Sequence, residues 1–530
     1  MPLAFLLVGA MSVGQCATNV TAMQTDSPHR EIANPIIWAD VPDVAVIRVG
    51  DNYYMSSTTM HMSPGLPIMK SRDLVNWKMV GYAYDTLGDN DALTLQNGKN
   101  AYGAGSWASS LRYHNGAYYV TTFSSTTGKT HVYTTRNIEK GLWKAASFSP
   151  ALHDHSLFFE DDGRVFMVHG AGNVRLTELT SDASAIKVGG VDQVIIQNAS
   201  LAAGPNIGLR AEGSQLRKIN GKYYLFMITW PRGGMRTQLV FRSDSLTGPY
   251  EGRVALKDGG VAQGGLIDTP KGDWYALLFQ DHGAVGRTPF LVPVTWQDGW
   301  PILGTDGKVP TTLRIPAGKS GVFGIVGSDE FDRRSGQPPL PLVWQWNHNP
   351  DNRYWSLSDR RGYLRLTTSR IDADLLSARN TLTQRTFGPE CSGTVAMDVS
   401  EMRDGDYAGL GLLQRRYGFV GVKMVGDTRS IIMVSAETAT PVEVQSVPLA
   451  QNTVYLKAEC DFKNRTDMAT FYFSTDGHTW TSLGNPLHMV YTLPHFMGYR
   501  FALFHYATKA PGGAVDFDYF RVSNKLTVRP

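Results

Sequence analysis

The sequence predicts an all-β protein in which a five-bladed β-propeller is followed by a second β domain. The first observation behind this prediction is a hairpin signature that recurs five times in the N-terminal part of the 530 residues. The second is composition: 54 glycines and 11% aromatic residues favour strands joined by tight turns, because aromatic side chains suit pleated sheets and glycine suits turns. The third is that helical periodicity is scarce throughout.

The repeated signature is a turn that contains glycine, followed by a pair of bulky and mostly aromatic residues. Its copies lie at residues 49–54, 114–119, 161–166, 219–224 and 270–275. Alternating apolar runs flank each copy, as a two-stranded ribbon with a tight turn requires. Five units of about fifty residues, each with several short strands, are typical of five propeller blades. The alternative is a β-sandwich whose hairpins are similar by coincidence.

Composition also argues against several classes of protein. The 50 Lys and Arg residues nearly balance the 47 Asp and Glu residues, so the net charge of +3 does not indicate nucleic acid or an anionic membrane as a partner. Three cysteines cannot form a disulfide framework. Cys391 and Cys460 are interpreted as small buried residues, with a single bridge between them as the alternative.

Residues 1–26 are predicted to form a signal or leader segment. The run from Leu3 to Val13 is apolar, has the length of a signal-peptide core and is too short to span a bilayer. No other segment looks transmembrane. We therefore expect a secreted or periplasmic protein.

The repeat also places chemistry-bearing residues in a common register. Counting back from the second bulky residue of each pair, by eleven residues in the first copy and twelve in the others, gives Asp43, Trp107, Asp154, Glu212 and Gln263. Equivalent positions on equivalent strands surround the axis of a propeller. The register therefore predicts that three acids from three blades meet, with Trp107 and Gln263 beside them.

Three carboxylates at one funnel mouth suit acid–base chemistry. They repel one another, and such sites separate pKa values so that one group is protonated while another is ionised. Each acid alone is more often a turn or cap residue. The shared register is the reason to group Asp43, Asp154 and Glu212.

Several segments resemble glycoside hydrolase family 43, in the family's own order. They are residues 34–37, 40–43, 46–54, 63–68, 71–77, 105–108, 153–158, 212–216, 286–289 and 293–301. The resemblance covers nearly all of residues 31–320 and implies a catalytic five-bladed propeller over residues 31–322. Members of this family act as β-xylosidases, α-L-arabinofuranosidases and arabinanases.

The resemblance also implies roles for individual residues. Asp43 matches the general base that deprotonates water, and Glu212 matches the general acid that protonates the leaving oxygen. Asp154 matches the carboxylate that raises the pKa of the acid and orients it, and Arg287 matches the arginine that meets sugar hydroxyls. The family inverts the anomeric configuration, which requires acid and base about 6.5–9.5 Å apart.

Further substrate contacts are predicted from residue type. Trp107 and Trp38 are candidates for stacking on a sugar ring, and His61 is a candidate for lining the site. Many family members place a histidine just before Gln-Gly-Gly, where this chain has Ala262, which puts a central Ca²⁺ in doubt. His282 could take that place, although a single histidine is more often an ordinary hydrogen-bonded residue.

A second domain is predicted over residues 326–526. Segments 328–331, 344–350, 378–385 and 417–422 resemble the lectin-like, concanavalin-like β-sandwich fused to many β-xylosidases of this family. The fusion implies an exo-acting enzyme, because the sandwich can contribute a loop that narrows the funnel. Asp329 and Asp518 could ligate one structural Ca²⁺. No cofactor is expected for the chemistry itself.

The predicted function is release of terminal β-D-xylose from xylo-oligosaccharides or xylosides by an exo-acting, inverting glycosidase. The alternatives are an α-L-arabinofuranosidase or bifunctional enzyme that trims arabinose side chains, and a carbohydrate-binding protein without activity. A fructan hydrolase is disfavoured because its Asn-Asp-Pro, Arg-Asp-Pro and Glu-Cys motifs are absent from the propeller segment. The expected partners are plant cell-wall oligosaccharides, xylan or arabinose-decorated glycans. The oligomeric state is not indicated.

Overall fold

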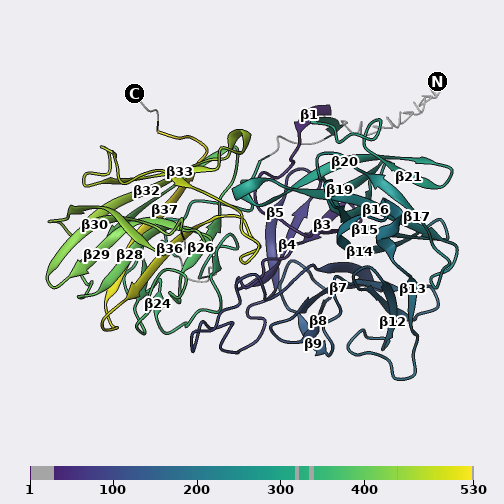
Figure 1. The fold of residues 1–530 in the computed structure, drawn as a ribbon, viewed down its shortest axis with the longest axis horizontal. Helices are drawn as coiled ribbons and strands as arrows, with labels where there is room; N and C mark the ends of the chain where they lie inside the picture. Colours follow the sequence, from purple (N-terminus) through teal and green to yellow (C-terminus); the bar gives the residue numbers. More distant parts are fainter. Residues whose placement is uncertain (2–28, 317–320, 334–338, 439, 528–530) are drawn as a thin grey trace.

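The computed structural model describes the chain except residues 2–28, 317–320, 334–338, 439 and 528–530. The predicted leader at 1–26 therefore lies, beyond Met1, outside the described residues. Two β bodies lie side by side in Figure 1, the propeller on the right and the sandwich on the left. In the described part, the helical elements are three short 3₁₀ turns, η1 (Ala199–Ala203), η2 (Gly283–Val285) and η3 (Lys463–Arg465). None is long and apolar enough to cross a membrane.

The N-terminal body consists of five four-stranded antiparallel sheets in chain order. Blade I comprises β2 (Ala45–Val49), β3 (Asn52–Ser56), β4 (Gly65–Ser71) and β5 (Lys78–Tyr84). Blade II comprises β6 (Ser110–His114), β7 (Ala117–Ser124), β8 (Lys129–Thr135) and β9 (Lys144–Phe148). Blade III comprises β10 (Ser156–Phe159), β11 (Val165–His169), β12 (Val174–Leu179) and β13 (Asp192–Ile196). Blade IV comprises β14 (Ile207–Ile219), β15 (Lys222–Pro231), β16 (Thr237–Ser243) and β17 (Glu251–Leu256). Blade V comprises β18 (Ala262–Asp268), β19 (Trp274–Asp281), β20 (Arg287–Gln297) and β21 (Trp300–Leu303).

The five repeated signatures are the hairpins between the first and second strands of the blades. In blade II, Asn115 and Gly116 adopt φ angles of 48° and 77° at the turn. Positive φ at both central residues is what a two-residue hairpin needs, and asparagine and glycine adopt it at low cost. The predicted all-β class and the five-bladed propeller are therefore confirmed.

The propeller closes into a ring through its first strands. Strand β2 contacts β6 and β18, β10 contacts β6 and β14, and β14 also contacts β18. Strand β1 (His29–Ala33) pairs antiparallel with β22 (Thr312–Pro316), which ties the two ends of the domain together. The beginnings of all five first strands therefore surround one end of the propeller axis.

The C-terminal body is a sandwich of two antiparallel sheets. One sheet has the order β23 (Gln345–Trp346), β26 (Leu382–Arg385), β36 (Arg500–Ala507), β28 (Asp406–Leu413), β29 (Gly418–Val425), β30 (Thr428–Ser435) and β31 (Val442–Pro448). The other has the order β24 (Trp355–Ser356), β25 (Leu364–Thr367), β37 (Ala514–Ser523), β27 (Glu390–Asp398), β32 (Thr453–Asp461), β33 (Met468–Ser474) and β34 (Thr481–Ser482), and β35 (Leu487–His488) also pairs with β33.

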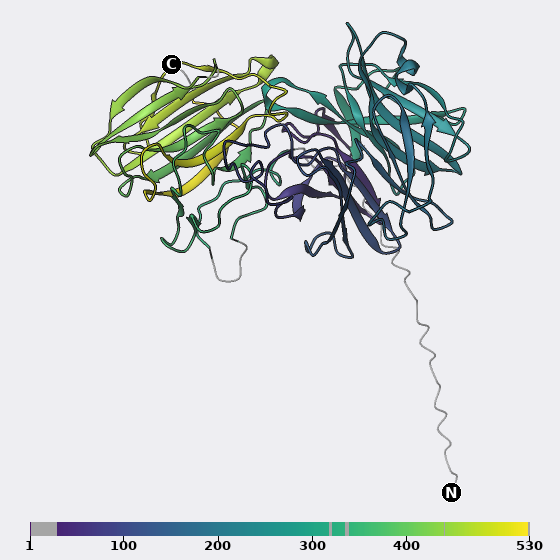
Figure 2. The ribbon, with the colours of Figure 1, turned by 60° about the horizontal axis from the view of Figure 1, so that its bottom comes forward.

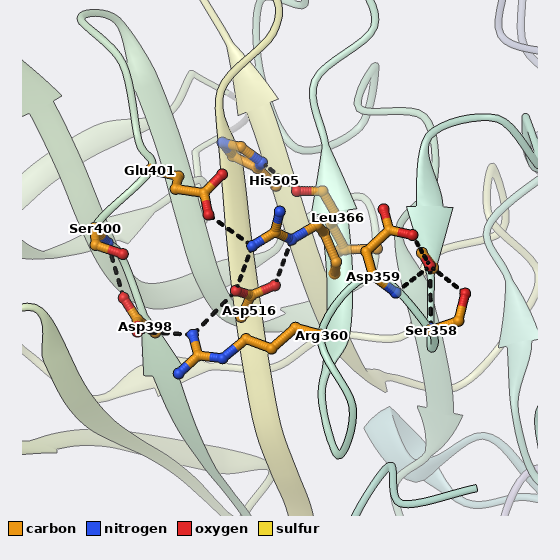
Figure 3. A network of polar contacts seen from close by, with 11 residues as sticks. Ser358, Asp359, Arg360, Leu366, Asp398, Ser400, Glu401, His505 and Asp516 are labelled. Carbon is orange, nitrogen blue, oxygen red and sulfur yellow. Dashed lines mark hydrogen bonds and ion pairs between the residues drawn. The ribbon is translucent and has the colours of Figure 1, made fainter.

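Polar contacts as well as apolar packing hold the sandwich together. Figure 3 shows Asp516, a buried residue of β37, next to Arg360. Asp516 accepts hydrogen bonds from Arg360 (3.1 Å) and from two nitrogens of Arg365 on β25 (2.8 Å each). Cys391 and Cys460 face each other on β27 and β32 as buried free thiols, so the alternative of a disulfide bridge is not realised.

The two bodies share an interface that includes blade I and the segment before it. In Figure 2 the purple first blade lies next to the green and yellow sandwich. Isolated bridges join Ser63 to Trp346 and Ala39 to Phe387, and Arg385 Nε donates to the Asp40 carbonyl at 2.9 Å. One apolar core cluster continues from the propeller into the sandwich. This packing places sandwich loops within reach of the propeller axis.

Candidate active site

The three predicted acids lie at the start of first strands, from three different blades. Asp43 precedes β2, Asp154 precedes β10, and Glu212 lies in the N-terminal half of β14. Asp43 and Asp154 have φ angles of 51° and 46°, and Gln263 of blade V has 66°. Asp is among the few residues that tolerate this left-handed conformation. Asp43, Asp154 and Gln263 therefore share one backbone conformation at equivalent positions, whereas Glu212 lies within the extended strand β14.

Asp43 forms a buried ion pair with Arg287 at the start of β20. Arg287 Nη1 donates to both carboxylate oxygens, at 3.0 and 3.1 Å, and the arginine is 2% exposed. Burial raises the pKa of Asp43 above its ordinary value, although the positive charge of Arg287 opposes the rise. Asp40 supports the pair, because its carboxylate accepts the backbone N–H groups of Arg287 (2.7 Å) and Gly498 (3.0 Å).

Glu212 and Asp154 share a histidine, His153. Its Nε2 is hydrogen-bonded to Glu212 Oε2 at 3.0 Å and lies 3.9 Å from Asp154 Oδ2. Burial lowers the pKa of His153, but the hydrogen bond with Glu212 and the charge of Asp154 outweigh it, so the pKa lies above its ordinary value. Burial raises the pKa of Asp154 to about 7, and the charges of Glu212 and Asp43 add to the rise. The three predicted acids therefore face a common space.

A row of aromatic rings borders this space. The ring of Trp107 lies 6.4 Å from that of Phe123 and 5.2 Å from that of Phe496, and Phe123 lies 5.1 Å from the ring of His153. Phe496 belongs to a sandwich loop, and its carbonyl accepts a hydrogen bond from Arg287 Nη2 at 3.3 Å. The sandwich thus contributes a side chain to the site. A loop from the sandwich was expected there, but Phe496 was not among the predicted residues.

Gln263 lies beside the acids, where the register predicted it. Its backbone N–H donates to Gln238 Oε1 at 2.8 Å. Gly213, which follows Glu212, leaves room for the Gln263 side chain, because a Cβ there would stand 3.1 Å from Gln263 Cγ. This close approach and the φ angle of 73° at Gly213 together favour glycine at this position.

Comparison with known proteins assigns the chain to a family. Residues 32–301 match the model of glycosyl hydrolases family 43, and residues 328–523 match the beta-xylosidase C-terminal concanavalin A-like domain. The chain belongs to glycoside hydrolase family 43. The predicted glycosidase class and the concanavalin-like sandwich are therefore confirmed.

Relatives of this family 43 chain carry two kinds of name. A β-xylosidase of Formosa agariphila is 29% identical over 98% of this chain and 97% of its own length. A non-reducing-end α-L-arabinofuranosidase of Bacteroides ovatus is 30% identical over 68% of each chain. Among solved structures, a bifunctional GH43-CE protein of Bacteroides eggerthii is 60% identical, with a TM-score of 0.93 over 94% of this chain. This chain spans 64% of that protein's length.

Two predicted substrate contacts of the family 43 chain lie in the interface between its domains. His61 is 1% exposed, and its Nε2 lies 3.0 Å from Asn347 Oδ1. Asn347 and His348 of the sandwich cover it, so the structure does not support its prediction as a lining residue. The Trp38 indole packs edge-on to His282 at 5.2 Å, against Gly388 of the sandwich.

Asp329, one of the predicted Ca²⁺ ligands, already has protein partners. The carboxylate of Asp329 accepts hydrogen bonds from Arg333 Nη1 (2.8 Å), Trp344 Nε1 (2.9 Å) and the Phe331 N–H (2.9 Å). Arg333 supplies the positive charge that a cation would supply, so Asp329 does not fit a Ca²⁺ ligand. Asp518 lies on β37, two residues before Phe520, whose backbone pairs with Asp329. His282, the candidate for a central metal of the propeller, has its Nδ1 3.1 Å from Gln280 Oε1.

Among the described residues, the group whose ligand atoms do lie within 4.8 Å of one another is His153, Asp154 and Glu212. His153, Phe123 and Phe496 were not predicted as site residues. His153 is adjacent in sequence to Asp154, and that proximity was the available signal.

Replacing Asp154 by asparagine should stabilise the protein increasingly as the pH rises. The raised pKa means that folded Asp154 keeps its proton up to about pH 7, whereas the unfolded chain loses it near pH 4. Wild-type stability therefore falls over that interval, and asparagine does not titrate. We expect the melting temperature of Asp154→Asn to exceed that of wild type by about 2–4 °C at pH 8 and by less at pH 5.

Thermal unfolding at both pH values checks this result. The exposed Asp85 supplies the matched control, since Asp85→Asn should show a melting-temperature difference that does not change with pH. A difference for Asp154→Asn that shrinks between pH 5 and pH 8 would contradict the raised pKa.

Proposed function

We propose that this glycoside hydrolase releases single pentose units from the non-reducing ends of plant cell-wall oligosaccharides, with inversion and with terminal β-D-xylose as the main substrate. The observation that carries the exo-acting mode is Phe496, which contacts both Trp107 and Arg287. A ring from the sandwich over this side of the site would block a polysaccharide from continuing past the first sugar.

In the proposed mechanism, Glu212 donates a proton to the glycosidic oxygen as the bond from that oxygen to the anomeric carbon breaks. Asp43 accepts a proton from the water that forms the new bond to this carbon from the opposite face. The charge of Arg287 favours the ionised form of Asp43 against the effect of burial, and Arg287 can donate its remaining hydrogens to sugar hydroxyls. His153 and Asp154 hold the Glu212 carboxyl in position.

The similar proteins indicate which sugar the enzyme releases, xylose or arabinofuranose. Both a β-xylosidase and an α-L-arabinofuranosidase are similar to the chain over two thirds or more of its length. The match of residues 328–523 to the β-xylosidase C-terminal domain favours xylose. Arabinofuranose is the second candidate.

The deciding assay compares aryl β-D-xyloside, aryl α-L-arabinofuranoside, xylobiose and xylohexaose, with the product anomer followed by proton NMR. We expect fastest release from the xyloside, xylose as the first product from xylohexaose, and α-xylose as the initial anomer. Internal cleavage would contradict the exo-acting mode. Initial β-xylose would contradict inversion. Faster hydrolysis of the arabinofuranoside would make arabinofuranose, and not xylose, the main substrate. Activity on none of the four would favour a binding protein.

A further inference from the structure

The inner hairpin of blade IV extends beyond the sheet that carries it. Strand β14 has 13 residues, whereas the first strands of the other blades have four to seven. Its pairing with β15 continues past Glu212 and Ile228 to Leu209 and Trp230. Glu212, the proposed acid, therefore lies where the two-stranded extension of β14 and β15 begins.

Trp230 is the most exposed tryptophan among the described residues, at 39%. Its indole N–H donates to the Gly234 carbonyl at 3.0 Å, and Arg236 Cζ lies 5.6 Å from its ring centroid. The ring is thus held in one orientation by the β15–β16 loop while much of its surface remains open to solvent. A large rigid aromatic surface that is already ordered binds a ligand at little entropic cost.

Contacts connect Trp230 to the acids. Arg236 Cζ also lies 5.3 Å from the ring of Phe279, and Arg287 Cζ lies 5.3 Å from that same ring. Arg236 forms an ion pair with Asp281 at 2.7 Å, which fixes the guanidinium. The charge of Arg236 acts on Asp43. Trp230 therefore belongs to the rim of the site and not to a remote surface.

We propose that Trp230 is the platform on which the leaving-group sugar stacks, the first sugar beyond the bond that is cleaved. This inference rests on the proposed function. The proton donor must lie next to the glycosidic oxygen, so the leaving group must extend along the wall that carries Glu212. Ile228 pairs with Glu212, and Trp230 lies two residues further along β15, about 7 Å at the usual strand rise. At that separation the first sugar beyond the bond can reach the ring of Trp230.

The test compares two substrates with the same glycosyl unit and different leaving groups. Xylobiose leaves a sugar, whereas β-D-xylosyl fluoride leaves only fluoride, which cannot reach Trp230. For Trp230→Ala we expect kcat/KM on xylobiose to fall about tenfold, mainly through a higher KM, because stacking binds ground state and transition state alike. On the fluoride, kcat/KM should stay within about twofold of wild type. Trp230→Phe should retain most of the activity on xylobiose.

Trp480 supplies the matched control, because it is a partly exposed tryptophan of the sandwich that stacks under Lys457. Trp480→Ala should leave kcat/KM unchanged on both substrates. Equal losses on both substrates for Trp230→Ala would assign the ring a structural role, and no loss on xylobiose would place the leaving group elsewhere. Both outcomes would contradict the proposed role of Trp230 and leave the proposed function unaffected. If wild type hydrolyses neither substrate, but does hydrolyse the corresponding arabinofuranosides, the same comparison is made with those.

Discussion

Replacing Glu212 by glutamine is expected to lower kcat on xylobiose by about 10²–10⁴, because the sugar leaving group then departs without a proton. The amide keeps the size of the carboxyl and can still meet His153, so the loss reports proton donation and not a collapsed site. Aryl xylosides with acidic phenol leaving groups need little protonation, so their hydrolysis should fall much less. Steady-state kinetics on the two substrate types measure the difference.

A buried glutamate elsewhere in the propeller provides the control for this variant. Glu178 on β12 is 4% exposed and pairs with Lys187 at 2.7 Å. Glu178→Gln should leave kcat on both substrates near that of wild type. A Glu212→Gln enzyme that hydrolyses xylobiose at the wild-type rate would remove Glu212 from the role of acid.

Replacing Asp43 by asparagine is expected to lower kcat by about 10²–10⁴ on xylobiose and on aryl xylosides alike. Water must be deprotonated whatever group leaves, so an acidic phenol leaving group does not reduce the loss of kcat. This uniform loss distinguishes the base from the acid. Asparagine still offers an oxygen to Arg287, which limits the cost of leaving a buried guanidinium without an acceptor.

A small anion can test the same role chemically. In Asp43→Gly, azide needs no deprotonation, so it should restore turnover of the aryl xyloside and yield a xylosyl azide of inverted configuration. Asp268, which pairs with Arg48, serves as the control position, and Asp268→Asn should keep wild-type rates. If Asp43→Asn affects xylobiose strongly and aryl xylosides little, Asp43 and Glu212 have exchanged roles.

The five hairpins and the acid register could be predicted because they are encoded locally. Turn residues such as Asn115 and Gly116 specify each hairpin by their own φ preferences. The closed ring then converts a repeat in sequence into a repeat around an axis. Asp43, Asp154 and Glu212 were found in this way before any contact between them was known.

Other features of the site depend on contacts between distant segments. Phe496 reaches Arg287 across 209 residues of sequence, and no periodicity marks the sandwich loop that carries it. Arg236 and Trp230 acquire their place only because β14 and β15 continue past the sheet. Arginine and tryptophan also occur at ordinary surface positions, so residue type alone does not assign Arg236 and Trp230 to the site.

The surroundings of two other predicted residues have the same origin. Asp329 looked suited to Ca²⁺ because a carboxylate is a hard ligand, but the fold supplies Arg333 as its counter-charge. His61 looked close to the site in sequence, but the docked sandwich covers it. The partner of a single polar residue depends on tertiary packing.

The amino-acid sequence by itself determined the all-β class, the number of blades, the presence of the sandwich and the three acids. These follow from short-range turn chemistry, from a repeated pattern and from motifs that can be compared directly. Only the tertiary structure decided which groups neighbour the acids, because burial and the charges of distant segments set the pKa values of Asp43 and Asp154. Those interactions exist only once the ring has closed and the sandwich has docked.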